Sequence, residues 1–167
     1  MAERWVVNAS PIILLAKAEI IHFLPNLCDE LIVPAGVLAE VENTHVTDAA
    51  LQWLKTRGGK FVKPVGAIHP ALHMWRGGAG EAEVISWALH NPGFTAILDD
   101  RAARSFAARN GVAVLGSLRV VVIAKERGLI PKAKPALERL RGSGAYVSDE
   151  LIDHAIILAR EDLKANR

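Results

Sequence analysis

Short apolar runs that alternate with helix-like segments limit the possible folds of this chain more than any other feature. Residues 5–7, 31–33, 95–98 and 112–115 are apolar runs too short for buried helices, so each predicts a buried strand. A fifth run, residues 60–65, contains a proline and is therefore expected at a sheet edge. Largely apolar strands connected by helices predict a parallel sheet with helices on both faces, an α/β fold.

Composition narrows the class of protein further. The chain has 167 residues, 51% of them hydrophobic, which is enough for one well-buried domain, so a single domain over residues 1–167 is expected. The only cysteine, Cys28, excludes an internal disulfide and a cysteine-based zinc site, and it fits a reducing compartment. The start of the chain lacks the pattern of a signal peptide, and the apolar run 12–16 is too short to span a bilayer. We therefore expect a soluble, cytoplasmic protein that makes no membrane contact.

Capping residues predict where several helices begin. Ser10 followed by Pro11 indicates a helix from about residue 11, because proline is favoured in the first helical position. Pro34 opens the next predicted helix in the same way. The hydroxyl side chains expected to cap other helices are those of Thr47, Ser117 and Ser148.

Two adjacent aspartates end the strand predicted at residues 95–98. Asp99 and Asp100 stand between this strand and an Ala- and Arg-rich helical segment. In open α/β sheets the carboxyl ends of the strands are where ligands bind, and carboxylates there can hold a hard cation. The alternative is purely structural: Asp100 caps the helix and Asp99 faces water.

Other polar residues fall at comparable places. Asn8 ends the first predicted strand, and Glu81 lies in the first turn of a helix, where a negative charge is also favoured by the helix dipole. Glu40 and Glu42 belong to one predicted helix but point about 200 degrees apart, so at most one of them can face a given site.

Charge is distributed unevenly along the chain. The net charge of +2 combines 7 basic and 11 acidic residues in positions 1–100, 10 basic and 2 acidic in positions 101–141, and 3 basic and 5 acidic in positions 142–167. A strongly cationic segment directly after the aspartate pair suits a polyanionic partner such as a nucleic acid. A solvated helix face is the structural alternative.

Two further motifs carry less weight. His69 and His73 are four residues apart, but no glutamate follows in the spacing of a zinc protease, and His69 precedes a proline. Residues 77–80, Gly-Gly-Ala-Gly, follow no predicted strand and lack the Lys-Ser/Thr ending of a phosphate loop, so a turn into the next helix is the expected role.

Five segments taken together resemble a known family. VVNASPII, VPAGVLAEVE, GEAEVISWAL, AILDDRAAR and GVAVLGSL occur in the order and with the intervening elements of the PIN-domain family, and they look most like its branch related to VapC-type toxins. The resemblance covers nearly the whole chain. It implies a three-layer α/β/α domain with a mostly parallel five-stranded sheet, frequent homodimers, and acidic residues that bind Mg²⁺ or Mn²⁺ and cleave RNA.

The resemblance assigns the acidic positions residue by residue. The helix acid of the family falls on Glu40, the acid that starts the middle helix on Glu81, with Glu83 as a substitute, and the acid after the fourth strand on Asp100 or Asp99. Glu40, Glu81 and Asp100 are therefore the expected metal ligands.

One position departs from the family pattern. The acid at the end of the first strand falls on Asn8, and Ser10 matches the small hydroxyl residue that follows it. Losing one negative charge should weaken cation binding and puts catalysis in doubt, although the amide oxygen of Asn8 can still ligate a cation or orient a water.

The proposed chemistry also has a physical basis in these residues. Carboxylates that converge at a sheet edge are poorly neutralised without a cation, and Mg²⁺ and Mn²⁺ prefer oxygen ligands. A water bound to such an ion is more acidic and can attack a phosphodiester, while the ion offsets developing charge. Arg101, Arg104 and Arg119 are then candidate phosphate contacts, with exposed helix faces as the alternative.

Three hypotheses follow. The first is a metal-dependent endoribonuclease, the toxin of a toxin-antitoxin pair, with RNA and an antitoxin protein as partners. The second is a degenerate PIN domain that binds RNA or a protein without cleaving, a possibility raised by Asn8. The third is a nucleotide-binding α/β module that uses residues 77–80.

Overall fold

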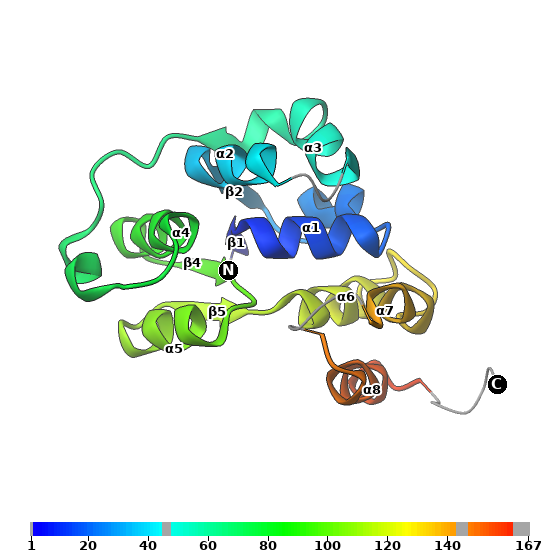
Figure 1. Cartoon of the computed structure of the whole chain (residues 1–167). Helices are drawn as coiled ribbons and strands as arrows, with labels where there is room; N and C mark the ends of the chain where they lie inside the picture. Colours follow the sequence, from blue (N-terminus) through cyan, green and yellow to red (C-terminus); the bar gives the residue numbers. More distant parts are fainter. Residues whose placement is uncertain (1, 45–47, 143–146, 162–167) are drawn as a thin grey trace.

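A five-stranded parallel sheet forms the centre of the molecule, as predicted (Figure 1). The computed structural model describes residues 2–44, 48–142 and 147–161. The strand order is β3-β2-β1-β4-β5, and every pair of neighbours is parallel. The strands are β1 (Arg4–Val7), β2 (Glu30–Pro34), β3 (Val62–Lys63), β4 (Phe94–Ile97) and β5 (Ala113–Leu115). The proline-containing run supplies β3 at the edge of the sheet, which confirms its predicted position.

The order of the strands reverses at β1. From β1 the chain first builds β2 and β3 on one side and then β4 and β5 on the other. Val6 pairs with Ile32 of β2 and with Ala96 of β4, so β1 is the central strand. Ligands of open α/β sheets bind at the carboxyl ends of the strands where the order reverses. Here that place is the region that follows β1 and β4, where Asn8 and the Asp99-Asp100 pair stand.

Helices flank the sheet and complete a three-layer α/β/α fold. The α-helices are α1 (Ala9–Lys17), α2 (Ala35–Asn43), α3 (Asp48–Lys55), α4 (Ala79–His90), α5 (Arg101–Arg109), α6 (Ser117–Glu126), α7 (Lys134–Leu140) and α8 (Asp149–Leu158). Short 3₁₀ helices are η1 (Ile21–Asn26), η2 (Gly59–Phe61) and η3 (Pro70–Met74). In Figure 1, α1 continues from the end of β1 with α2 and α3 on one side and α6 and α7 on the other.

The core explains why the inner strands are mainly apolar. Trp5, Val6 and Val7 of β1 are fully buried, as are Ile97, the last residue of β4, and Leu98, which follows it. Each such side chain contributes roughly 1.5–3 kcal/mol of burial free energy, so both faces of the sheet favour apolar residues. Among the helices of the described residues, none combines the length and the apolar character needed to cross a bilayer.

The helix starts were predicted with mixed success. Helix α1 begins at Ala9, with Asn8 in the N-cap position, so the prediction that Ser10 is the cap was wrong. Pro11 is accommodated as the third helical residue because the first N–H groups of a helix have no partners within it. Ser148 does cap α8, accepting a hydrogen bond from the N–H of Leu151 at 3.2 Å.

Ser117 was also wrongly predicted to be a cap. It is the first residue of α6, behind Gly116, and its backbone N–H donates to a carboxylate oxygen of Asp99 instead. The predicted cap at Thr47 lies outside the described residues.

Candidate metal-binding site

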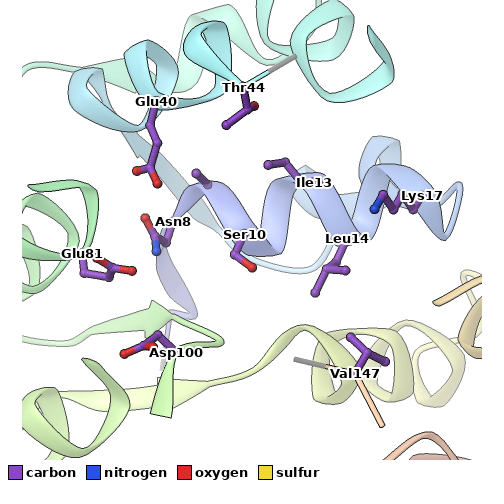
Figure 2. A pocket seen from close by; sticks show the side chains of 11 residues that line it. Asn8, Ser10, Ile13, Leu14, Lys17, Glu40, Thr44, Glu81, Asp100 and Val147 are labelled. Carbon is purple, nitrogen blue, oxygen red and sulfur yellow. The ribbon is translucent and has the colours of Figure 1, made fainter. Parts of the chain in front are cut away.

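A pocket opens at the sheet edge where the strand order reverses (Figure 2). Its volume is about 280 Å³. Three carboxylates and one amide from four different segments line it, those of Glu40, Glu81, Asp100 and Asn8. The remaining lining residues are Ala9, Ser10, Ile13, Leu14, Lys17, Thr44 and Val147. Polar groups far apart in the sequence therefore meet in one place.

Asn8 joins the end of β1 to the start of α1. Its backbone N–H donates to the carbonyl of Ile97 at 3.2 Å, which holds the residue beside the end of β4. The side chain is 2% exposed, and its Oδ1 atom has no hydrogen-bond partner among the described residues. A buried carbonyl oxygen without a partner costs about 1–3 kcal/mol, so this atom favours a cation or a water in the pocket.

Glu40 reaches the pocket from α2 through space left open by a glycine. A methyl group added to Gly80 would lie 2.3 Å from Glu40 Oε2 and 3.1 Å from Asn8 Oδ1. Gly80 is buried in the first turn of α4, so the helix can approach both oxygen atoms only because this residue has no side chain. Although Glu40 is exposed, partial burial of its carboxylate and then the negative charge of Glu81 raise its pKa.

Glu81 lies in the first turn of α4 and folds back over the start of that helix. Its Oε2 atom would be 2.3 Å from a methyl group on Gly78, the residue in the N-cap position. Glu81 also lines the pocket, and its negative charge contributes to the raised pKa of Glu40. Like charges that face one pocket favour a cation there.

Asp100 both caps a helix and lines the pocket. Its Oδ2 atom accepts a hydrogen bond from the N–H of Ala103 at 2.8 Å, which caps α5. Capping and a place at a ligand site were posed as alternatives, but one carboxylate has two oxygen atoms, so capping α5 does not keep Asp100 from lining the pocket.

Asp99 points to another part of the molecule. Its two oxygen atoms accept hydrogen bonds from the N–H and the hydroxyl of Ser117, at 2.8 and 2.6 Å, and it lines a different pocket beside α6 and α8. Burial raises the pKa of Asp99, while the Ser117 hydrogen bonds, the charge of Arg104 and the Ser10 hydroxyl lower it. Asp99 therefore joins β4 to α6 and is not the solvent-facing residue of the structural alternative.

The remaining predicted site residues lie in the acidic pocket, in the pocket beside Asp99, or on the surface. Ser10 lines the acidic pocket, and its hydroxyl also lowers the pKa of Asp99 through a hydrogen bond. Arg104 and Arg119 line the Asp99 pocket, and Arg119 pairs with Glu126 at 3.3 Å. Arg101 is exposed at the start of α5.

Glu83, the substitute for Glu81, is used elsewhere. Its Oε2 atom accepts a hydrogen bond from the N–H of Gly36 at 2.7 Å, which ties α4 to the start of α2. Glu81 is therefore the carboxylate of this helix that lines the pocket.

The donor set fits a hard divalent cation in chemistry. Oxygen atoms from three carboxylates and one amide are the ligands that Mg²⁺ and Mn²⁺ prefer. Within the described residues, however, no three His, Cys, Asp or Glu side chains are close enough together to hold an ion as they stand. To hold one ion, the flexible side chains of Glu40 and Glu81 would have to rotate so that their oxygen atoms approach each other. The buried, unpartnered Asn8 Oδ1 would stay in place beside that ion.

Three features of the pocket were not predicted from sequence. Gly78 and Gly80 make room for the carboxylates, whereas the sequence suggested only a turn. Lys17 and Thr44 line the pocket, and no sequence motif pointed to either. The spacing of Ser10 and Lys17 along one helix was the available signal, because residues seven apart share a face.

The fold and the pocket together define an α/β/α domain with carboxylates where the strand order reverses, a class suited to phosphate chemistry with a cation. A family model described as a PIN domain matches residues 4–161. The chain therefore belongs to the PIN-domain family, whose function is of nuclease type and whose members generally use divalent metals. Comparisons with the curated proteins and with the solved structures found no match.

Proposed function

We propose that this PIN domain is a metal-dependent endoribonuclease that holds Mg²⁺ or Mn²⁺ with Glu40, Glu81 and Asp100. The observation that carries the proposal is the meeting of these three carboxylates and the unpartnered Asn8 Oδ1 in one pocket. When bound, the cation would make a water more acidic and offset the charge that develops on the phosphate.

The protein residues have distinct parts in this proposal. Asp100 is held by its cap to α5 and Asn8 by its backbone link to β4, so both present oxygen atoms from rigid positions. The carboxylates of Glu40 and Glu81 lie at the ends of flexible side chains, so they can adjust to the position of the ion. The raised pKa of Glu40 means that its carboxylate takes up a proton more readily than an ordinary glutamate, which suits a group that receives a proton.

RNA is the proposed substrate because cationic side chains lie near the acids in the chain. Arg101 is exposed on the first turn of α5, directly after Asp100, and is free to contact a phosphate beside the pocket. Arg104 is exposed on the same helix and lies next to Asp99. Arg119, paired with Glu126, is the weakest of the three candidates.

A second function is favoured by one specific observation. Asn8 stands where an acid is expected, and within the described residues the acids do not form a closed three-residue site. A PIN domain that binds RNA or a protein without cleavage is therefore the alternative.

Cleavage of mixed-sequence single-stranded RNA with Mn²⁺, Mg²⁺ or a chelator tests the proposal. We expect cleavage that needs the metal and is lost in Glu81→Gln and Asp100→Asn. Glu83→Gln is the matched control, because it lies on the same helix outside the pocket and glutamine retains an oxygen acceptor for the N–H of Gly36. Equal cleavage by wild type and Glu81→Gln would refute the assignment.

Asn8→Asp distinguishes the two functions. If wild-type protein leaves RNA intact and Asn8→Asp cleaves it, the non-cleaving alternative is correct. If wild type cleaves already, the added carboxylate is expected to tighten metal binding.

The proposal extends to the biological setting. We propose that the protein acts in the cytoplasm as the toxin of a toxin-antitoxin pair, as a homodimer held inactive by an antitoxin protein. Growth arrest on expression that Asp100→Asn abolishes would support the toxin role, and light scattering of the purified protein measures its oligomeric state.

A further inference from the structure

The acidic pocket continues along α1 beyond the carboxylates. Ser10, Ile13, Leu14 and Lys17 are spaced three, four and seven residues apart, so they lie on one face of this helix. All four line the pocket, and Figure 2 shows them in succession from Asn8 to the far end of α1. The pocket is therefore a groove whose floor is α1, with Glu40 of α2 and Thr44, directly after that helix, on one side and Asp100 and Val147 on the other.

The groove changes character from one end to the other. Next to the acids it is polar, while its middle is lined by the apolar side chains of Ile13, Leu14 and Val147. Its far end carries the ammonium group of Lys17, which forms no ion pair with another of the described residues. Ser10 and Lys17 are about 10 Å apart along the axis, from the rise of ~1.5 Å per helical residue.

We infer that this groove binds one unstacked nucleotide of single-stranded RNA, the neighbour of the phosphate held at the acids. The base lies against Ile13, Leu14 and Val147, and Lys17 contacts the next phosphate of the strand. The order of features along the groove matches the order of groups along an RNA strand. The acids hold a phosphate through a cation, the apolar wall holds a base, and Lys17 holds the next phosphate. This inference rests on the proposed function for the position of the first phosphate.

Thr44 supplies a polar contact on the wall of the groove. Its hydroxyl donates to the carbonyl of Val41 at 2.9 Å, which leaves the oxygen of that hydroxyl able to accept a hydrogen bond. A donor on the edge of the base is the natural partner. Such an edge is accessible only when the base is unpaired, so the groove discriminates against duplex RNA.

The size of the groove agrees with a single base. Its volume of about 280 Å³ is just below the range of roughly 300–1,000 Å³ typical of small-molecule sites. One base enters such a space, whereas a stacked duplex does not.

Binding of a fluorescent, mixed-sequence single-stranded RNA over a series of salt concentrations tests the inference. All proteins carry Asp100→Asn, so that the strand is not cut; any loss of phosphate binding at the acids is then common to every variant compared, and asparagine is an equally good helix cap. We expect Lys17→Gln to weaken binding roughly five- to tenfold and to reduce the slope of log affinity against log salt by about 0.7, the value for one phosphate of a single strand. Lys17→Arg is expected to restore both quantities.

Lys55→Gln is the matched control. Lys55 also stands in the last turn of its helix, α3, but it is exposed and outside the groove. Loss of a favourable helix-end charge affects both variants alike, so only a phosphate contact separates their salt slopes. Equal slopes for Lys17→Gln and Lys55→Gln would overturn the inference, as would duplex RNA that binds as tightly as the single strand.

Ile13→Ser tests the apolar wall separately. We expect several-fold weaker binding with an unchanged salt slope, because no charge is removed. Thermal unfolding of each variant shows whether the fold is intact, and the Lys17 variants decide the question if Ile13→Ser unfolds.

The outcomes separate the groove from the nuclease activity. A reduced slope in Lys17→Gln without any Mn²⁺-dependent cleavage by wild type supports the groove and refutes the nuclease. Cleavage by wild type with an unchanged slope in Lys17→Gln supports the nuclease and refutes the groove.

Discussion

Gly80→Ala separates the stability of the fold from the integrity of the site. The added methyl group would lie 2.3 Å from Glu40 Oε2 and 3.1 Å from Asn8 Oδ1. Glu40 ends a flexible side chain, so it moves away at little cost to the fold. Alanine is favoured over glycine inside a helix by about 0.5–1 kcal/mol, which offsets residual crowding of Asn8.

The expected effect on metal binding is much larger. Mn²⁺ at 100 times its dissociation constant stabilises a protein by ~2.7 kcal/mol, or roughly 5–11 °C in Tm for a chain of this size. Loss of a supporting partner of a metal ligand lowers metal affinity about 10- to 100-fold, and displacement of Glu40 is at least as severe. A 100-fold loss leaves a gain of only ~0.4 kcal/mol, or roughly 1–2 °C, at the same Mn²⁺ concentration.

Thermal unfolding in chelator and in Mn²⁺ measures both effects. Gly36→Ala is the matched control: its methyl group would lie 2.0 Å from Glu83 Oε2, so it displaces a carboxylate that is outside the pocket. We expect Gly36→Ala to retain the full Mn²⁺ shift and Gly80→Ala to lose most of it. The reasoning is refuted if Gly80→Ala gains as much Tm from Mn²⁺ as wild type, or if it is strongly destabilised in chelator.

Two further predictions concern charge and stability. Because the pKa of Glu40 is raised in the folded state, folded protein binds more protons than unfolded protein between the ordinary carboxyl pKa of about 4.3 and the raised value, and stability falls as pH rises through this window. In chelator, Glu40→Gln should therefore have a higher Tm than wild type at pH 7 and the same Tm below about pH 4. Asp99→Ala removes both acceptors of Ser117 and should lower the free energy of unfolding by about 1–3 kcal/mol while leaving the Mn²⁺ shift in place; Asp99→Asn, which keeps an acceptor, should cost less. Chemical denaturation of wild type, Asp99→Ala and Asp99→Asn measures these free energies of unfolding, and an Asp99→Ala protein as stable as wild type would contradict the prediction.

Much of the fold could be predicted because most strands have a recognisable pattern in their own short stretch of sequence. The three inner strands, β1, β2 and β4, are mainly buried, so apolar runs such as Trp5 to Val7 are visible in the sequence without knowledge of their partners. The resemblance to PIN domains then supplied the order of the layers, and the family match confirms it.

Local signals were insufficient to separate Asp99 from Asp100. The two residues are adjacent, and both follow the same strand. Which of them faces the pocket depends on where α6 begins, because Ser117, eighteen residues further along the chain, draws Asp99 away. Such long-range hydrogen bonds have no signature in the sequence around the aspartates.

The roles of Gly80 and Lys17 were hidden for a similar reason. Gly80 is needed only because Glu40, from another helix, occupies the space of its side chain. Lys17 belongs to the groove only because α2 and Val147 provide its walls. In both cases the neighbours come from segments distant in sequence, so tertiary structure alone reveals the role.

Anomalous diffraction from crystals of this protein soaked in Mn²⁺ tests the central claim most directly. The account predicts one strong peak in the pocket, within ligand distance of Glu40, Glu81 and Asp100 and close to Asn8 Oδ1, and no peak there in Glu81→Gln. A crystal at saturating Mn²⁺ whose peaks lie elsewhere, or in which the three carboxylates remain apart with no ion between them, would contradict it.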